Sequence, residues 1–379
     1  MRRTLMITAA AAALVMMGGG VANAAIGWTV QTAPPPADSQ QTVLYGVSCT
    51  SAANCTAVGY YRSGGGGLTL AEHWDGTAWS VQTTPNPAGE NVGSAYLDGV
   101  SCASATSCTA VGEYGNPSGS AQYPLAEHWD GSTWTIQATP RPKNSAHAGL
   151  DAVSCPSATS CTAVGSAGAE HWNGTAWRVE ATPVAAGLKD VTWNGISCVS
   201  GPSCVAVGQS GNSASTTVTL AEQRTGLTWS ALPSASPGST WNALTSVSCR
   251  TATSCTAVGQ YANSSGPGLV LAEHWNGSAW TVQTTVNPGS GGSASLESVS
   301  CPLATNCTAV GSYVTRAGVT ATLVEHWGGS EWRTQRPINP PTYPHRYLDG
   351  VSCAKATGCT AVGWMQPRSG ALVTLAEAN

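Results

Sequence analysis

A pair of cysteines separated by five residues recurs seven times along this chain and accounts for all 14 of its cysteines. The pairs are Cys49/Cys55, Cys102/Cys108, Cys155/Cys161, Cys198/Cys204, Cys249/Cys255, Cys301/Cys307 and Cys353/Cys359. Most first cysteines follow one another at intervals of about 52 residues, and the step from Cys155 to Cys198 is shorter. Self-similarity at a fixed period of this length is typical of repeat architectures. The chain is therefore expected to fold as an array of similar units.

Each repeat contains four short segments with the composition of β-strands, which we name a to d in chain order. In the second repeat they are residues 97–101 (LDGVS), 108–112 (CTAVG), 125–129 (LAEHW) and 134–137 (WTIQ). Gly, Pro, Ser and Asp separate them, and Asp130-Gly131 marks a tight hairpin between c and d. Four strands in a repeat of roughly 40 to 50 residues predict a β-propeller blade. The predicted fold class is all-β, a seven-bladed β-propeller of four-stranded blades.

The two ends of the repeat array predict how the ring closes. The seventh repeat stops inside strand c at residues 375–377, with no strand d. Residues 26–32 (IGWTVQT) match residues 78–83 (AWSVQT), which are strand d of the first repeat. We therefore expect the N-terminal strand to complete the last blade, because closure hides the sheet edges that an open row of blades exposes.

Residues 1–24 are predicted to be a signal peptide. Arg2 and Arg3 precede an apolar stretch at 5–17, and Ala22-Asn23-Ala24 has the small residues of a cleavage site. The apolar stretch is shorter than a membrane span. The paired arginines also suit the twin-arginine route, but that route exports folded proteins from a reducing compartment, where disulfides are rare. We expect residues 25–379 to form one secreted, extracellular and monomeric propeller.

Charge and missing motifs limit the classes of function. Charged residues make up 9% of the chain and its formal net charge is −4, so no basic surface is expected for nucleic acid. Only three lysines occur, which argues against binding to an anionic membrane: Lys143, Lys189 and Lys355. G-x-S-x-G, H-E-x-x-H, Walker A and G-x-G-x-x-G motifs are missing from the sequence. We therefore predict no cofactor and identify no catalytic residue.

The cysteine pairs flank the turn between strands a and b. Two cysteines that face each other across such a hairpin lie within reach of a disulfide. A loop this small gains about 2–3 kcal/mol from its bond in the chain-entropy model. A metal site is the alternative, but it needs four ligands at shorter spacings. We predict seven disulfides that staple these turns, and no metal site.

Two other repeated motifs invite a functional interpretation. The motif W-[DN]-G-[ST]-x-W recurs at the turn between strands c and d, and its tryptophans suit either sugar stacking or a wedge between blades. We favour the wedge. Strand c carries a glutamate in all seven repeats, to which we assign a structural role, with the carboxylate accepting bonds from Ser or Thr hydroxyls or backbone amides. These are Glu72, Glu127, Glu170, Glu222, Glu273, Glu325 and Glu377.

The segments between strands b and c and between d and a vary most among repeats. Binding residues tend to occupy variable loops on a rigid scaffold, so we place ligand binding on the b–c/d–a face and at the mouth of the central channel. The candidates are tryptophans outside the repeated positions, a loop rich in Arg and Tyr, and acidic residues that open strand a. They are Trp241, Trp364, Tyr343, His345, Arg346, Tyr347, Asp98 and Asp349, with Asp151 and Glu297 at positions like those of the last two.

The motifs V-S-C-x5-C-T-A-V-G and A-E-H-W-[DN]-G-[ST]-x-W resemble the repeats of secreted bacterial propeller proteins over residues 26–377. The W-[DN]-G-[ST]-x-W turn is also similar to turns in propeller lectins, and this resemblance implies sugar binding. We predict a non-catalytic recognition module for an extracellular glycan or polymer. The alternatives are a polysaccharide-acting glycosidase or lyase that uses the channel-mouth carboxylates, and a protein-binding scaffold or inhibitor.

Overall fold

The computed structural model describes residues 27–379, apart from 88–92, 142–146, 184–187, 213–215, 265, 289–290, 341 and 369. The predicted signal peptide lies outside the described residues. The regular structure of this part of the chain consists of 28 β-strands. It contains no helix that is long and apolar enough to cross a membrane.

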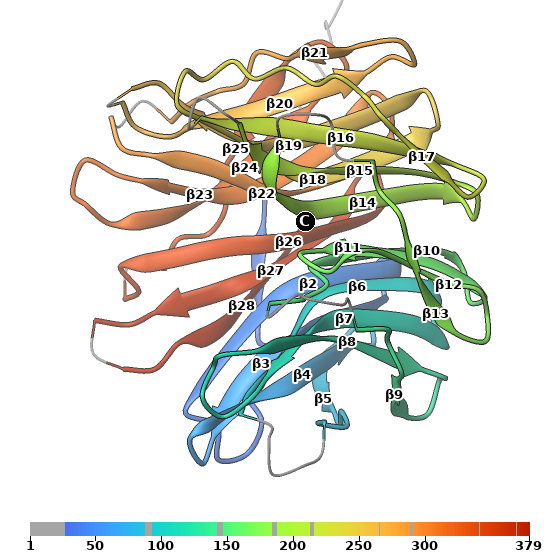
Figure 1. Ribbon diagram of the computed structural model, residues 1–379. Coiled ribbons are helices and arrows are strands. Elements are labelled where there is room, and N and C mark those ends of the chain that lie inside the picture. The colour runs from blue at the N-terminus through green and yellow to red at the C-terminus, as the bar shows by residue number, and fades with distance from the viewer. Residues whose placement is uncertain are drawn as a thin grey trace, which may run out of the picture.

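The strands form runs of four that are hydrogen-bonded in chain order (Figure 1). Five runs are separate four-stranded sheets, and the strands of each follow one another in chain order. The first two are β2(Gln41–Ser51), β3(Asn54–Ser63), β4(Gly66–Trp74) and β5(Trp79–Gln82), and then β6(Ala95–Ser104), β7(Ser107–Gly115), β8(Gln122–Trp129) and β9(Trp134–Gln137). The next three are β10(Ala152–Ser157), β11(Ser160–Gly165), β12(Gly168–Trp172) and β13(Trp177–Glu180); β14(Lys189–Ser200), β15(Ser203–Gly211), β16(Thr217–Thr225) and β17(Thr228–Ala231); and β18(Trp241–Thr251), β19(Ser254–Ala262), β20(Leu269–Trp275) and β21(Trp280–Val282).

The remaining eight strands share one sheet, which consists of two further runs. One run is β22(Ala294–Leu303), β23(Asn306–Val314), β24(Thr320–Trp327) and β25(Trp332–Gln335), and the other is β26(His345–Lys355), β27(Gly358–Gln366), β28(Val373–Ala378) and β1(Thr29–Gln31). A single parallel bridge between Thr320 and His345 joins them. We interpret each run of four strands as one blade, which gives seven blades.

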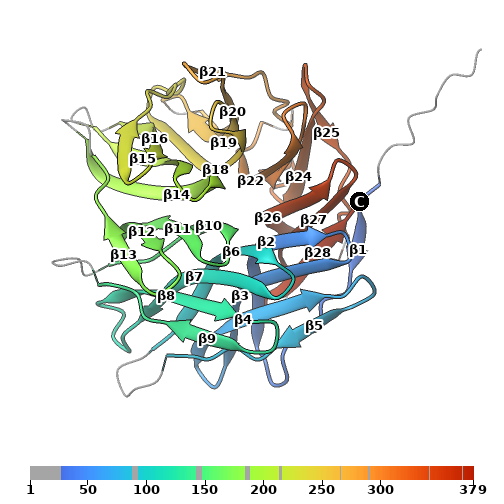
Figure 2. The ribbon, with the colours of Figure 1, turned by 90° about the vertical axis from the view of Figure 1, so that its right-hand side faces the viewer.

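The first strand of every run lies innermost, as Figure 2 shows, and the last strands lie at the periphery. The innermost strand of each run contacts the innermost strand of the next run. β26 of the last run also contacts β2 of the first, so these contacts form a complete circle. The runs therefore form a closed ring, and the all-β propeller predicted from the repeats is confirmed.

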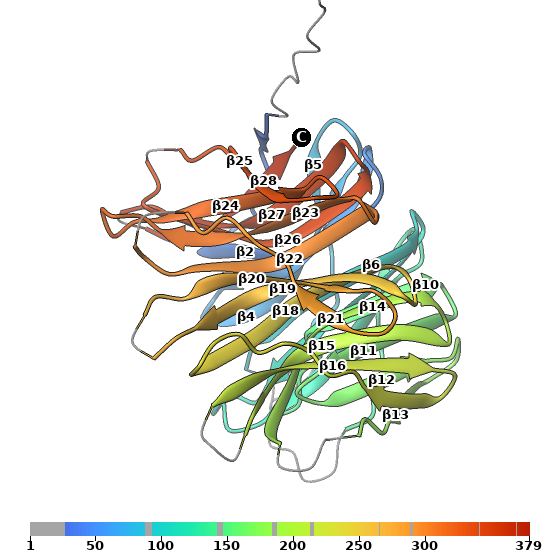
Figure 3. The same ribbon diagram turned by 90° about the horizontal axis from the view of Figure 1, so that it is seen from above.

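The ring closes through the N-terminal strand, as predicted. β1 pairs with β28 in antiparallel register, with Val30 opposite Glu377, and Figure 3 shows the two strands side by side near the C-terminus. Trp28 is buried beside this pair, and its indole N–H donates to Gln335 Oε1 at 2.8 Å. The first described residues therefore supply the outer strand of the last blade.

A cyclic set of hydrogen bonds links every blade to the next. The serine directly before the first cysteine of each blade accepts a bond from the backbone N–H of the first cysteine in the following blade, at 2.9–3.0 Å. In the order serine and cysteine, the pairs are Ser48 and Cys102, Ser101 and Cys155, Ser154 and Cys198, Ser197 and Cys249, Ser248 and Cys301, Ser300 and Cys353, and Ser352 and Cys49. Every interface between blades therefore carries the same polar contact.

The seven predicted disulfides are present, and each joins strands a and b of one blade. They are Cys49–Cys55, Cys102–Cys108, Cys155–Cys161, Cys198–Cys204, Cys249–Cys255, Cys301–Cys307 and Cys353–Cys359. Among the described residues there is no free cysteine. The prediction that these pairs are disulfides is confirmed.

The second cysteine of each disulfide also contributes to the packing between blades. These seven residues are buried, with exposed fractions of 0–2%: Cys55, Cys108, Cys161, Cys204, Cys255, Cys307 and Cys359. The reason is that their sulfur atoms face the preceding blade, where in six cases a threonine hydroxyl lies 3.5–3.7 Å away. Cys255 meets Val205 at the equivalent position. These cysteines therefore belong to the core between blades.

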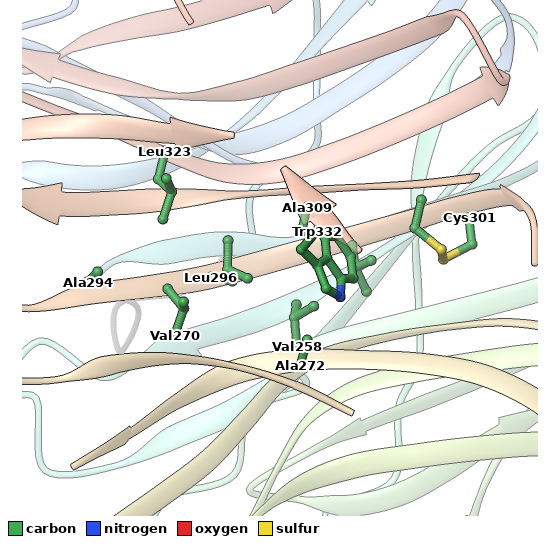
Figure 4. Packing of buried hydrophobic residues seen from close by; sticks show 11 residues of the cluster. Val258, Val270, Ala272, Ala294, Leu296, Cys301, Ala309, Leu323 and Trp332 are labelled. Carbon is green, nitrogen blue, oxygen red and sulfur yellow. A yellow bond between two sulfur atoms is a disulfide. The ribbon is translucent and has the colours of Figure 1, made fainter. Parts of the chain in front are cut away.

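The strand d tryptophans fill the spaces between blades, as the wedge interpretation requires. Figure 4 shows Trp332 packed beside Val258 and Ala272, which belong to the preceding blade. Six of these indoles donate a hydrogen bond at 2.8–2.9 Å to a strand d side chain of the preceding blade. Each of these wedges therefore combines apolar burial with one directed polar contact.

The strand c glutamates are buried in every blade, with exposed fractions of 0–3%. The predicted hydrogen bonds are mostly not formed. Among the described residues, only the amide of Ala235 meets hydrogen-bond geometry with one of these carboxylates, at 3.3 Å from Glu273 Oε2. The prediction of a well-bonded carboxylate is therefore wrong for most blades.

Proline explains much of this difference. The position six residues after each strand d tryptophan lies beside the strand c glutamate of the following blade. Ala235, Val286 and Ile338 occupy this position, and their backbone N–H groups lower the carboxyl pKa of Glu273, Glu325 and Glu377, respectively. Before the first four glutamates the position holds a proline, which has no N–H to donate: Pro34, Pro85, Pro140 and Pro183. Burial then raises the pKa of the first three of these glutamates to about 8 and that of the fourth to about 7: Glu72, Glu127, Glu170 and Glu222.

Candidate functional site

Seven equivalent residues, one from strand a of each blade, meet at one end of the central channel. In six blades the pairing of strands a and b shifts register at this residue, as between Leu44 and Gly46, so that Tyr45 is left over in a β-bulge. Bulges re-aim a side chain out of the regular alternation of a strand. In the third blade the residue, Asp151, comes directly before β10. This bulge ring consists of Tyr45, Asp98, Asp151, Asn194, Thr245, Glu297 and Asp349.

Small residues beside the bulge ring allow the innermost strands to approach closely. A Cβ atom placed on Gly350 would lie 2.7 Å from the backbone oxygen of Tyr45, and one on Gly46 would lie 3.1 Å from that of Asp98. A larger side chain here would push neighbouring blades apart. Close contact of the backbones leaves the side chains of the bulge ring to line the opening.

The bulge ring lines a cavity of about 560 Å³ on the b–c/d–a face. A second tier of polar and aromatic side chains, from strand b and from the start of β18, completes it: Tyr60, Gln209, Gln260, Trp364 and Trp241. The Tyr45 and Tyr60 rings stack with centroids 5.9 Å apart. The described residues that line the cavity include no Lys, Arg, His or Cys.

Burial and nearby carboxylates raise the pKa values of Asp98, Asp151 and Asp349 in the bulge ring. Burial, with the nearby Glu297 carboxylate adding to it, raises the pKa of Asp349 to about 8, and the Trp364 indole acts in the opposite direction. Burial and then Asp151 raise the pKa of Asp98 well above its usual range. Burial, reinforced by Glu113, raises the pKa of Asp151 to about 7.

Two acceptor atoms at this cavity have no hydrogen-bond partner among the described residues. They are Oδ2 of Asp349 and Oε1 of Gln209, and both are buried. A buried acceptor without a donor carries a desolvation cost of about 1–3 kcal/mol. A ligand that supplies donors to these two atoms would remove that cost.

The structure brings four of the eight predicted ligand-binding residues to the cavity: Asp98, Asp349, Trp241 and Trp364. Tyr347 stands behind them and stacks on Trp364, with ring centroids 4.1 Å apart and an interplanar angle of 22°. It therefore fixes the orientation of a lining residue.

Of the other three predicted residues, Tyr343 lies just before β26, and His345 and Arg346 are its first two residues. His345 Nδ1 is 3.3 Å from Thr320 Oγ1, and Tyr343 packs against the core of the last blade. Arg346 is only 7% exposed, and its guanidinium donates to the Pro340 carbonyl at 2.7 Å. None of the three lines the cavity, and Arg346 holds its own loop in place.

Sequence reasoning missed several lining residues. Tyr45 and Asn194 occupy the same repeat position as Asp98, and Tyr60 and Gln209 occupy the position of Trp364. The signal was present in the aligned repeats, because both positions vary where their neighbours are nearly constant. Only the acidic residues at the first position and the tryptophan at the second were selected as candidates, so the other residues at these two positions were missed.

A second cavity, of about 510 Å³, adjoins the first on the same face. Tyr96 lines it and contacts Tyr60 of the first cavity edge to face, with centroids 4.9 Å apart. Glu113 and Gln122 also line it, and Gln122 Nε2 donates to Glu113 Oε1 at 2.7 Å. Aromatic and polar surface thus continues from the channel mouth along the first two blades.

Two solved structures resemble this fold. A structure described as YCF48 bound to D1 peptide matches with a TM-score of 0.54 and 13% identity, over 93% of this chain and 96% of its own. A GH74 xyloglucanase from Xanthomonas campestris matches with a TM-score of 0.52 and 14% identity, over 92% of this chain and 53% of its own, so this chain spans about half of that enzyme. No protein-family model and no curated protein matches the chain. At these identities the likeness shows the propeller fold alone.

Proposed function

We propose that the protein is an extracellular recognition module that binds a glycan at the channel mouth on the b–c/d–a face. The observation that carries this proposal is the cavity where the bulge ring meets four aromatic side chains, Tyr45, Tyr60, Trp241 and Trp364. Aromatic faces pack against the C–H surfaces of a sugar, and carboxyl and amide groups accept bonds from its hydroxyls. Such a mostly preformed hollow with a few polar groups is typical of a binding site.

Other features support a rigid extracellular module. Seven disulfides suit an oxidising environment. The second cavity offers room for further units of a linear chain beside Tyr96. The two similar structures include a propeller with a bound peptide and a xyloglucanase, so the fold is compatible with both kinds of partner.

The test is binding of a panel of polysaccharides and oligosaccharides to the oxidised protein, followed by alanine variants of the aromatic wall. Trp241→Ala should weaken binding about tenfold or more, as loss of an aromatic anchor does. Trp129→Ala, a half-buried tryptophan at the c–d turn, is the matched control and should bind as the unaltered protein does. Failure to bind any glycan, or equal loss in both variants, would reject the proposal.

A polysaccharide-acting enzyme is the second candidate, because three cavity carboxyls, those of Asp98, Asp151 and Asp349, have raised pKa values. Asp349, with a pKa of about 8, is suited to donate a proton near neutral pH, and Glu297 lies close enough to act on it electrostatically. If this is the function, the protein releases reducing ends from a polysaccharide and Asp349→Asn abolishes the release. Binding without turnover in the unaltered protein would leave recognition as the function.

A further inference from the structure

Carboxyl groups, which only accept hydrogen bonds when ionised, dominate the charge of the channel mouth. Four carboxyl groups line the cavity, together with amide side chains that include Gln209 and Gln260, and no cationic side chain among the described residues offsets them. Asp349 Oδ2 and Gln209 Oε1 are buried there without a donor. A ligand that donates hydrogen bonds would satisfy these two atoms, and one that also carries positive charge would favour the ionised form of carboxyls whose pKa values burial raises.

The aromatic side chains have the same preference. Tyr45, Tyr60, Trp241 and Trp364 line the cavity among these carboxyls. The face of an aromatic ring attracts a cation within about 6 Å of its centroid. An ammonium group has three donors and no acceptor, so it matches both the rings and the unpartnered oxygens.

The spacing of the carboxyls favours an organic cation over a metal ion. Among the described residues, no three His, Cys, Asp or Glu side chains lie together as metal ligands do. The carboxyls of the bulge ring form two pairs from neighbouring blades, Asp98 with Asp151 and Glu297 with Asp349, and these pairs lie on separate parts of the ring. A ligand with amino groups at intervals can meet several of them, whereas a single metal ion cannot.

We propose that the channel mouth selects glycans that carry protonated amino groups, such as chains of 2-amino-2-deoxy sugars. This inference rests on the proposed function and names its substrate class. The sugar rings pack on the aromatic wall while their ammonium groups donate to Asp349, Gln209 and the other acceptors of the bulge ring.

The test compares two tetrasaccharides by titration calorimetry, a β-1,4-linked glucosamine tetramer and its fully N-acetylated counterpart. The amino form should bind about tenfold more tightly or better, a ratio equivalent to ~1.4 kcal/mol, and its advantage should shrink in high salt. Tetralysine serves as a probe for amino groups without a sugar. We expect it to bind more weakly than the amino tetrasaccharide.

Asp349→Asn should remove most of the preference for the amino form and leave the N-acetylated form little affected. Asn194 already occupies the same repeat position, so asparagine is compatible with the fold there. The matched control is Asp130→Asn at an exposed c–d turn, where Asn276 is the natural equivalent. Both variants should keep the melting temperature of the unaltered protein, and the control should keep the preference.

The outcomes separate the inference from the function beneath it. Equal binding of the two tetrasaccharides, or tighter binding of the N-acetylated form, overturns the inference and leaves glycan recognition standing. Binding of tetralysine with neither sugar, or binding of none of the three probes, overturns the inference, and the panel of polysaccharides and oligosaccharides then decides the proposed function separately. An equal loss of preference in Asp130→Asn would likewise reject the role given to the bulge ring.

Discussion

At the scale of single residues, the strand d tryptophans depend on a side chain in the preceding blade. Six of them find a glutamine or glutamate there as acceptor. Trp280 is buried, and its Nε1 has no partner among the described residues. The equivalent acceptor position in the preceding blade, three residues after its strand d tryptophan, holds Leu232. One apolar side chain in the fourth blade therefore leaves a donor unsatisfied in the fifth.

Replacing Leu232 with glutamine should supply the missing acceptor. We expect the new hydrogen bond in Leu232→Gln to contribute about 1 kcal/mol to the free energy of unfolding, the net value of one such bond. The reverse change at an intact pair, Gln283→Ala beside Trp332, should cost about 1–3 kcal/mol. Urea unfolding with all disulfides intact measures the two effects, and no difference between the variants would contradict the argument.

The fourth blade also departs from the others at Arg224, which replaces the strand c tryptophan. Its guanidinium is buried and pairs with Glu180 through Nε at 2.7 Å and through Nη2 at 2.5 Å. Glu180 stands where most blades have the glutamine acceptor, and it also receives the Trp229 indole at 2.8 Å. Glu180 in place of glutamine therefore neutralises the buried charge of Arg224, which stands in place of tryptophan.

Breaking this pair on one side should be costly. Glu180→Gln leaves a buried cation without its counter-charge, and we expect a loss of about 3–5 kcal/mol in the free energy of unfolding. The double variant Glu180→Gln/Arg224→Trp restores the residues of the other blades and should recover most of that loss. A double variant no more stable than Glu180→Gln alone would show that the two positions are not coupled.

At the scale of elements, the segment after strand d sets the environment of the next strand c. Where it offers a backbone N–H, the buried carboxyl has a pKa of about 7, as in Glu273. Where it offers proline, the pKa reaches about 8 in three blades of four, as in Glu127. The residue at one position of the segment after strand d therefore affects the pKa of the strand c glutamate in the next blade.

Exchanging these residues should exchange the pKa values. Pro85→Ala provides an N–H opposite Glu127 and should lower its pKa toward that of Glu273, while Val286→Pro should raise the pKa of Glu325 above its present value of about 7. Carboxyl carbon chemical shifts followed by NMR during a pH titration measure both. Parallel shifts in the two variants, or none, would contradict the assignment of the N–H as the cause.

The elements also show what sequence reasoning can and cannot reach. The period of the cysteine pairs and the match between residues 26–32 and 78–83 were sufficient for the strands, the disulfides and the closing strand. Simple alternation along strand a does not show that Asp98 and Asp349 line the channel mouth, because a bulge turns them there. The burial of Arg346 was also hidden, since its hydrogen-bond partner Pro340 lies in an irregular loop.

At the scale of the whole molecule, the strand c glutamates form a ring of buried acids. Their pKa values in the folded protein are about 7–8, whereas the ordinary value is 4.5. Between these values the folded state holds protons that the unfolded state releases. Folding stability therefore falls as pH rises from about 4.5 to 8.

The protein should accordingly melt at a higher temperature at about pH 5.5 than at about pH 8.5. Burial lowers the pKa of four strand c histidines, which weakens the fold below their ordinary pKa of 6.5 and opposes the gain at the acid end: His128, His171, His274 and His326. Replacing Glu72 with glutamine should flatten the decline above pH 6.5, because one raised pKa is removed. Calorimetric melting across this pH range tests both statements, and a higher melting temperature at pH 8.5 would contradict them.

The last blade takes its outer strand from the opposite end of the chain, and this affects refolding at high protein concentration. Until β1 docks, β28 presents an unpaired edge. The β1 segment of a second molecule offers that edge the same register and the same buried indole as its own. Strand exchange between two rings would therefore keep every native pairing while tying the rings together. Concentrated refolding is thus a competition between self-closure and the formation of interlinked pairs.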